Sequence, residues 1–319
     1  MKANIPRISL LIYLVLLVAA QVAIGRPSQT AAQATTDQTS SFTVGEGPEA
    51  VAFDGANIWV ANQFSSTVNK VRVSDGVVLG TYSVGERPVA LVFDGANIWV
   101  ANYLSDNVTK LRATDGIKLG VFATGDGPGG LAFDRVNIWV ANRNSNNVTK
   151  LRASDGVTLG TFAVGTRPIA LAFDGSSIWV TNNKSNTATK LRASDGAALG
   201  TYPVGKGPFG IAFDGTSMWV ANFFSKNLMK LASDGSVVAQ VAVGDGPAGM
   251  IYAGSYIWVA NNGSNTVSKV EPTVGVVVGT FAVSRGPFGV VFDGSNVWVA
   301  CAGVSTVSKI RPAAASSVP

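Results

Sequence analysis

Seven tryptophans recur along this chain at an almost constant spacing. They stand at Trp59, Trp99, Trp139, Trp179, Trp219, Trp258 and Trp298. Consecutive tryptophans are 40 residues apart, except for the 39 residues that separate Trp219 from Trp258. A fixed period of this length is the signature of a repeat architecture, in which every repeat is one supersecondary unit. The repeated region is therefore expected to fold as a single array and not as two independent domains.

Each repeat contains four short apolar runs separated by turn residues. In the first repeat these runs cover residues 50–53, 57–62, 67–73 and 77–84, and Gly, Pro, Asp or Asn stands at every boundary. The runs are rich in Val, Ile, Phe, Trp and Thr, which favour strands. Helices are disfavoured, because 36 of the 319 residues are glycine and glycine costs about 1 kcal/mol in a helix interior.

A four-stranded unit repeated seven times predicts an all-β fold, a seven-bladed β-propeller with four-stranded blades. The tryptophans would wedge between neighbouring blades. Residues 41–44 match the fourth run of a repeat, whereas the last repeat stops after its third run at Ile310. We therefore expect the N-terminal strand to complete the last blade, so that no edge is left unpaired. The propeller would span residues 41–311, followed by a C-terminal tail at 312–319.

The first 40 residues differ from the repeats. Lys2 and Arg7 precede an apolar run over residues 8–25, which is typical of a signal peptide. We expect a signal peptide at 1–25, with cleavage possible as late as residue 34, and a polar linker at 26–40. The protein would then be extracytoplasmic, either secreted or periplasmic, with no stable membrane insertion after cleavage. An uncleaved signal anchor is the alternative, since eighteen residues can just span a bilayer.

The composition excludes several kinds of chemistry. The chain has no histidine and one cysteine, Cys301. Histidine-dependent triads, His-ligated metals, zinc-cysteine sites and intrachain disulfides are therefore excluded. The Asp-Gly turns supply one carboxylate each, whereas a calcium ion needs six to eight converging oxygens. No catalytic residue, metal site or cofactor is expected.

A lysine recurs on the third strand of every repeat. The seven are Lys70, Lys110, Lys150, Lys190, Lys230, Lys269 and Lys309. A nucleic-acid site needs basic residues clustered on one surface, whereas this repetition distributes them around a ring. We expect a structural role instead, with the ammonium group near a turn aspartate such as Asp54 or Asp75, and no binding of nucleic acid.

The repeat motif resembles a known group of propellers. The Pro-x-Gly-hydrophobic opening, the strand Trp179-Val180-Thr181-Asn182 and the segment Ser264 to Val267 are similar to YVTN-family repeats. The resemblance covers residues 41–311 and extends more loosely to NHL-repeat propellers and streptogramin B lyases. It implies a seven-bladed propeller whose first strands line the central channel, and it is unspecific for activity.

The resemblance to the lyases also implies where catalytic residues would stand. Those enzymes carry histidines directly after the loop proline and a glutamate just before one such proline. In this chain the residues after the prolines are Glu49, Val89, Gly129, Ile169, Phe209, Ala248 and Phe288. The residues before the prolines are glycine or arginine. Lyase chemistry of that type is therefore not expected.

The loop after the tryptophan strand differs in every repeat, whereas strands and turns are nearly identical. Variable loops on a rigid scaffold are where binding usually occurs. The candidate ligand-binding residues in these loops are Phe64, Tyr103, Arg143, Lys184, Phe223 and Phe224. Phe209, Phe288 and Glu49 join them because the Gly-x-x-Pro loops should lie on the same face.

These observations lead to two main hypotheses of function, beside the third possibility of a structural surface protein with no soluble ligand. The first is a non-catalytic, monomeric binding scaffold that recognises a protein, peptide or glycan through its loop-variable face. The alternative is a metal-dependent lyase- or lactonase-like enzyme at the channel mouth. That alternative requires carboxylates to converge there, and the available ones are Glu46, Glu49, Glu86, Asp126 and Asp245.

Overall fold

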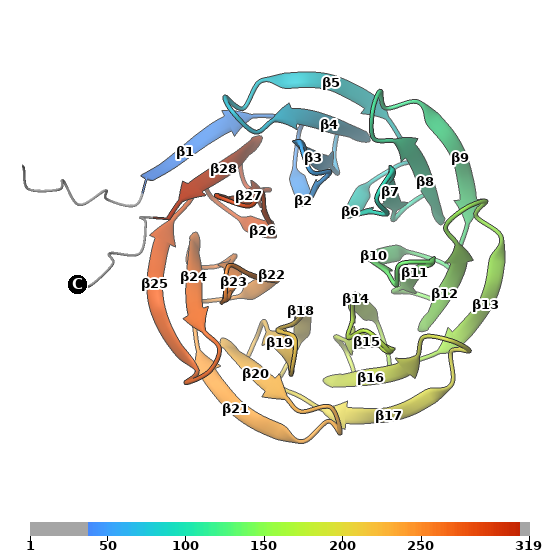
Figure 1. Cartoon of the computed structure of the whole chain (residues 1–319), viewed down its shortest axis with the longest axis vertical. Helices are drawn as coiled ribbons and strands as arrows, with labels where there is room; N and C mark the ends of the chain where they lie inside the picture. The colour runs from blue at the N-terminus through green and yellow to red at the C-terminus, as the bar shows by residue number, and fades with distance from the viewer. Residues whose placement is uncertain (1–37, 313–319) are drawn as a thin grey trace, which may run out of the picture. The chain divides into compact units, whose positions relative to one another are not determined.

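The computed structural model describes residues 38–312, and these form seven four-stranded antiparallel sheets arranged around a common axis (Figure 1). The predicted all-β seven-bladed propeller is confirmed. The expected signal peptide, the linker up to residue 37 and the tail from residue 313 lie outside the described residues. Among residues 38–312 we find no long apolar helix of the kind that crosses a bilayer.

The first two strands of each repeat form the inner half of a blade. The first strand begins at the proline of the Gly-x-x-Pro loop and lies innermost, as expected (Figure 1). The innermost strands are β2 (Pro48–Phe53), β6 (Pro88–Phe93), β10 (Pro128–Phe133), β14 (Pro168–Phe173), β18 (Pro208–Phe213), β22 (Pro247–Ala253) and β26 (Pro287–Phe292). The tryptophan strands are β3 (Asn57–Asn62), β7 (Asn97–Asn102), β11 (Asn137–Asn142), β15 (Ser177–Asn182), β19 (Met218–Asn222), β23 (Tyr256–Asn261) and β27 (Val297–Cys301).

The other two strands form the outer half of a blade. The lysine strands are β4 (Thr67–Arg72), β8 (Asn107–Arg112), β12 (Asn147–Arg152), β16 (Thr187–Arg192), β20 (Asn227–Leu231), β24 (Thr266–Glu271) and β28 (Thr306–Arg311). The outermost strands are β5 (Val78–Ser83), β9 (Lys118–Ala123), β13 (Thr158–Ala163), β17 (Ala198–Pro203), β21 (Val237–Ala242), β25 (Val276–Ala282) and β1 (Gln38–Thr43).

Strand β1 closes the ring as the outermost strand of the last blade. It pairs antiparallel with β28 from Gln38 opposite Arg311 to Thr43 opposite Thr306. The strand begins three residues before the expected start at Ser41. Because the first strand and the last repeat share one sheet, the seventh blade has the same four strands as the others.

The tryptophans pack between blades, as the repeat predicted. Trp59 of the first blade is fully buried against Ile98, Val100 and Leu111 of the second. Trp298 of the last blade packs in the same way against residues of the first. Each sheet therefore buries both faces, which explains why its inner strands are apolar on both sides.

An aspartate and a lysine hold the tryptophan in place in six of the seven blades. In the third blade Asp134 Oδ2 accepts a hydrogen bond of 2.7 Å from Trp139 Nε1, and Asp134 Oδ1 accepts two more from the backbone of its own turn. Lys150 Nζ lies 4.9 Å from the centre of the Trp139 ring and donates a 2.7 Å hydrogen bond to the Ala193 carbonyl of the fourth blade. The lysine is thus a link between neighbouring blades.

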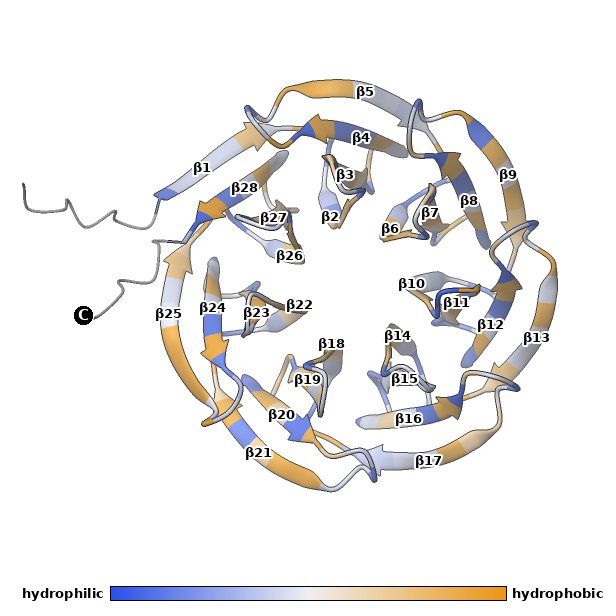
Figure 2. Ribbon diagram, viewed as in Figure 1, coloured by the Kyte–Doolittle hydropathy of each residue, from blue (hydrophilic) through white to orange (hydrophobic). Residues whose placement is uncertain are grey.

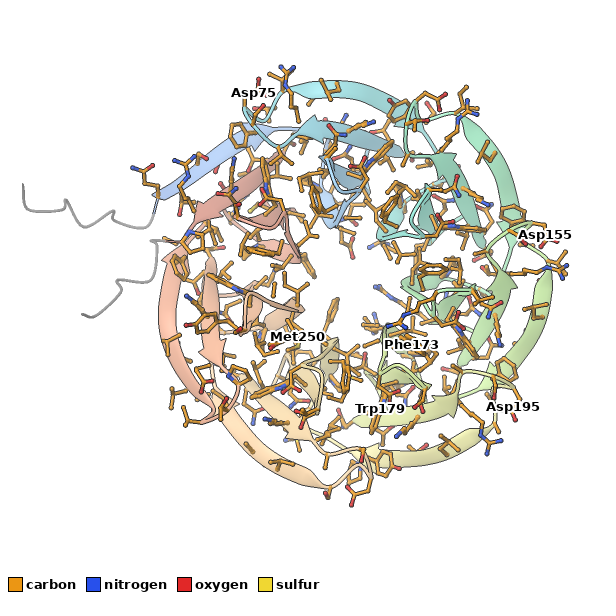
Figure 3. All side chains as sticks on the ribbon, in the orientation of Figure 1. Asp75, Asp155, Phe173, Trp179, Asp195 and Met250 are labelled. Atoms are coloured by element: carbon orange, nitrogen blue, oxygen red, sulfur yellow. The ribbon has the colours of Figure 1, made fainter. Side chains whose placement is uncertain are left out.

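The partners of the lysines differ in part from the turn aspartates that were expected. Lys70 Nζ donates to the carbonyl oxygens of Ala113 and Thr114, and Asp75 pairs with Arg72 instead. Weaker ion pairs of the expected type do occur, at 3.7 Å between Lys190 and Asp174. Figure 3 shows Asp75 at the periphery of the ring. The seven lysines are therefore part of the blade packing and do not form a surface patch.

Hydropathy separates the inner and outer strands. The tryptophan strand β7 is buried from its second residue to its end, whereas the outermost strand β9 of the same blade alternates between exposed and partly buried residues. Figure 2 shows hydrophobic segments on the outer strands β5, β21 and β25. The outermost strand of the last blade, β1, is more polar, with the sequence QTSSFT.

Asp134→Ala tests the tryptophan lock. We expect the variant to lose about 3 kcal/mol in its free energy of unfolding, because the buried Trp139 indole and two backbone N–H groups lose their acceptor. Urea-induced equilibrium unfolding measures this loss. Asp126→Ala, which removes an exposed carboxylate of the same blade, should change the value by less than about 0.5 kcal/mol. Equal effects of the two substitutions would contradict the assigned role.

Arg135→Gly tests a local backbone strain. Arg135 has a φ of 80° at a turn position where the other Asp-Gly turns place glycine, such as Gly175 at 98°. We expect the variant to be more stable by about 0.5–1 kcal/mol in thermal unfolding. The reverse change, Gly175→Arg, should destabilise by a similar amount through the backbone alone, because a Cβ there would contact nothing within 4 Å.

Candidate functional site

The residues that follow the loop prolines surround a cavity on the propeller axis. The cavity measures about 190 Å³ and is lined by the first residues of the innermost strands, including Glu49, Val89, Gly129, Phe209 and Phe288. Engineered apolar cavities of about 150 Å³ accommodate benzene. This cavity can therefore hold one ring-sized group, with the remainder of a ligand lying on the surrounding face.

The variable loops reach across to the neighbouring blades around this cavity. Gln63 Oε1 accepts a hydrogen bond from Arg87 of the second blade, and Asn183 donates to the Pro208 carbonyl of the fifth. The Tyr103 hydroxyl lies 3.4 Å from Asn144 Oδ1 of the third blade. Loop residues and Gly-x-x-Pro loops thus form one face, as expected from the strand order.

Arg143 behaves differently from the corresponding residues of the other blades. Its side chain lines the axial cavity and lies against Gly129 of its own blade, so closely that a Cβ at residue 129 would overlap the Arg143 Nε atom. Gly129 is the only glycine among the seven residues that follow the loop prolines. The missing side chain at residue 129 makes room for the guanidinium group of Arg143.

Charged residues gather on one side of the cavity. Arg143 and Arg87 both lie against the Tyr103 ring, with guanidinium carbons 5.5 Å and 5.1 Å from its centre. Glu49 belongs to the same electrostatic cluster, and Arg167 of the fourth blade adds its positive charge. This charged sector is contributed by blades one to four.

Burial dominates the ionisation of two members of the charged sector. The pKa of Glu49 is raised because protein replaces water around the carboxylate, and the charges of Arg143 and Arg87 oppose the rise. The pKa of Arg143 is lowered by burial, although Glu49 acts in the opposite direction. Arg143 stays positively charged throughout the physiological range. In addition, its buried Nε–H has no hydrogen-bond partner.

Aromatic residues gather on the opposite side of the cavity. The Phe209 ring lies 5.8 Å from Phe288 and 6.3 Å from Phe223, measured between ring centroids. Phe224 meets Phe223 edge to face at 5.2 Å and is 68% exposed. These distances are typical of interacting aromatic pairs. The four rings form an aromatic sector that continues from the cavity wall onto the surface.

The remaining sequence candidates lie away from the cavity. Phe64 is exposed beside a separate shallow depression that Leu104 also borders. Lys184 is exposed on its loop. Met250 instead lines the cavity from β22, as Figure 3 indicates, although nothing in the sequence distinguished it.

Arg87 and Arg167 join the charged sector although they were not among the candidates. Both stand just before a loop proline, with φ values of 54° and 58°, where the five other blades have glycine. The left-handed backbone region costs a non-glycine residue about 1 kcal/mol or more. Two arginines at glycine positions were therefore a visible signal in the sequence.

The carboxylates required by the metal-dependent alternative do not converge. Glu49 lines the axial cavity, Glu86 borders the shallow depression, and Asp245 is paired with Lys226 at 2.9 Å. Among residues 38–312 no three His, Cys, Asp or Glu side chains are grouped closely enough to hold a metal ion. Cys301 is buried and its Sγ atom contacts the Ser308 hydroxyl. Burial raises the pKa of its thiol, and Cys301 is therefore a core residue.

Glu49→Gln tests the electrostatics of the cavity. Because the pKa of Glu49 is raised in the folded state, the native protein holds this proton more tightly than the unfolded chain. Ionisation of Glu49 therefore lowers the stability of the folded protein once the pH rises above 4.5, which is the ordinary pKa of a glutamate. We expect the variant to be more stable than the wild type at pH 7.5 and nearly equal at a pH well below that value, in urea unfolding.

Asp115→Asn serves as the opposite control. Arg112 lowers the pKa of Asp115 to about 2, so ionised Asp115 stabilises the folded state at neutral pH and this contribution fades as the pH falls toward 2. Its replacement should lower stability slightly at pH 7.5. A Glu49→Gln effect with the same sign as that of Asp115→Asn would contradict the raised pKa.

Comparison with known proteins shows that this chain shares its fold with several solved structures. No protein-family model and no curated protein matches this chain. A streptogramin B lyase structure aligns at 18% identity and a TM-score of 0.75, over 86% of this chain and 97% of that chain. A catalytically inactive virginiamycin B lyase from Staphylococcus aureus with quinupristin aligns at 16% identity and 0.76, over 86% and 99%.

Proteins with different roles share the same fold. Hydrazine synthase of Kuenenia stuttgartiensis aligns at 18% identity and a TM-score of 0.73, over 90% of this chain and 99% of that chain. U3-55K aligns at 12% identity and 0.76, over 86% and 98%. The expected likeness to streptogramin B lyases therefore holds for the propeller fold, and assignment to the YVTN repeats stays a prediction.

Proposed function

We propose that this protein is a non-catalytic binding propeller that recognises a protein, peptide or glycan through its loop-variable face. The observation that carries the proposal is the aromatic sector of Phe209, Phe223, Phe224 and Phe288, which leads from an axial cavity onto the surface. Aromatic rings bury a large area at a small cost in conformational entropy, and they suit peptide side chains and sugar faces.

The surrounding chemistry favours binding over catalysis. A general acid–base mechanism needs a titratable pair in reach of one substrate, and Glu49 is the single carboxylate among the residues that line the cavity. Its neighbours there are apolar residues, glycines and Arg143. For this reason we prefer the scaffold to a metal-dependent lyase- or lactonase-like enzyme.

The proposal includes a location and a repeat type, both inferred from sequence. The apolar run at 8–25 supports export of the protein to the periplasm or the medium, where it would act as a monomer, with a signal anchor as the alternative. The Trp179-Val180-Thr181-Asn182 strand supports membership of the YVTN repeats. The lysines bind backbone carbonyls within the ring, which argues against a role in nucleic-acid binding.

Phe209→Ala combined with Phe288→Ala tests the aromatic sector. We expect binders found for the wild-type protein on a peptide array and a glycan array to lose at least about tenfold in affinity, because each truncation removes an aromatic ring that lines the cavity. Surface plasmon resonance measures the affinities. Phe64→Ala is the matched control, since it removes an exposed phenylalanine outside the cavity.

Two results would contradict the proposal. One is binding that is unchanged in the double variant, or lowered equally by Phe64→Ala. The other is the absence of any binder to the wild-type protein on both arrays.

A further inference from the structure

The axial cavity combines opposite kinds of surface on its two sides. Blades one and three contribute Glu49 and Arg143, which line it, and blades two and four contribute Arg87 and Arg167, whose positive charges act on Arg143 from outside the lining. Blades five and seven contribute the phenylalanines. The three guanidinium groups and the one carboxylate give the charged sector a net charge of about +2 when all are ionised. A ligand that matches both sides carries a negative charge next to an apolar group.

Arg143 is the positively charged member of the charged sector that lines the cavity, and Glu49 is the other member that does so. Phe209 and Phe288 line the cavity as well. The Nε–H of Arg143 is buried without a partner, and its terminal Nη2 makes one long contact of 3.4 Å to the Gly129 carbonyl. A buried donor without an acceptor costs about 1–3 kcal/mol. A carboxylate seated in the cavity would give the terminal N–H groups of Arg143 a charged acceptor, and it matches the planar edge of a guanidinium.

Arg87 and Arg167 flank Arg143 from the adjacent blades, and both keep an unfavourable backbone conformation to do so. Their φ values of 54° and 58° lie where glycine is the favoured residue. Strained backbone conformations of this kind cluster at ligand sites. The guanidinium group of Arg87 lies on the Tyr103 ring, which it shares with Arg143.

We propose that the cavity binds a carboxylate attached to an aromatic or other apolar group, with the carboxylate on Arg143 and the apolar group against Phe209 and Phe288. Arg87 and Arg167 add positive charge around the carboxylate. This inference rests on the proposed binding function and names the ligand class for it. The carboxylate belongs either to a free organic acid or to the C-terminus of a peptide that ends in an apolar residue.

Calorimetric titration of the purified chain with two matched compounds tests the inference. N-acetyl-L-phenylalanine carries the carboxylate, and N-acetyl-L-phenylalaninamide differs only by its neutral amide. We expect the acid to bind at least about tenfold more tightly, because hydrogen bonds to charged groups are worth about 1.5–3 kcal/mol. A pentapeptide that ends in phenylalanine, as free acid and as amide, distinguishes a peptide C-terminus from a free acid.

Arg143→Gln should reduce the affinity for the acid by about tenfold and leave that for the amide unchanged. Arg285→Gln is the matched control, because the Arg285 guanidinium already binds the Gly303 carbonyl of its own blade. The double variant Arg87→Gly with Arg167→Gly should bind the acid more weakly and yet unfold at a higher temperature, since glycine relieves the backbone strain. A merely structural role for these arginines predicts the opposite change in unfolding temperature.

Each outcome has a defined meaning. Preference for the acid in either pair of compounds, lost in Arg143→Gln and kept in Arg285→Gln, supports the inference. Equal binding of acid and amide, equal effects of the two glutamine variants, or no binding of any of the four compounds overturns it. The array binders that depend on Phe209 and Phe288 would survive that failure, so the broader proposal is tested separately.

Discussion

The hydrogen bond between a tryptophan indole and the aspartate that begins its turn is the interaction on which the ring depends. It spans only five residues, from Asp134 to Trp139 for example, and it anchors a large buried ring between two blades. The lysine that covers the tryptophan then reaches a carbonyl of the next blade. A short-range bond thus positions an interblade contact, and repetition extends it around the ring.

The ring is closed by the same elements. Lys309 of the last blade donates to the Val73 carbonyl of the first at 2.8 Å, while β1 completes the sheet of the last blade. The sixth blade departs from the pattern, since Tyr256 lies against Lys269 at 3.8 Å and no aspartate precedes Trp258 by five residues. The blade keeps its four strands all the same, which indicates that packing tolerates the loss of one such bond.

Against this uniform frame, the face with the variable loops is asymmetric. Glycine at residue 129 admits Arg143, whereas phenylalanine at the equivalent position 209 builds the aromatic sector. Contacts such as that of Gln63 with Arg87 join the loops of neighbouring blades on this face. The asymmetry of the face arises from single differences between a few repeats, and the sheets below allow those differences without a change of fold.

The sequence by itself determined the number of blades, the four strands of each, the closing strand and the face that carries the variable loops. It could do so because periodic tryptophans and turn residues reflect local preferences and one repeated packing contact. It also pointed to Phe209, Phe223 and Phe288. Only the tertiary structure decided that Arg143 turns into the cavity, that Arg87 and Arg167 join it, and that Phe64 stays outside. These arrangements depend on distances between side chains of different loops and blades, and no local sequence pattern encodes such distances.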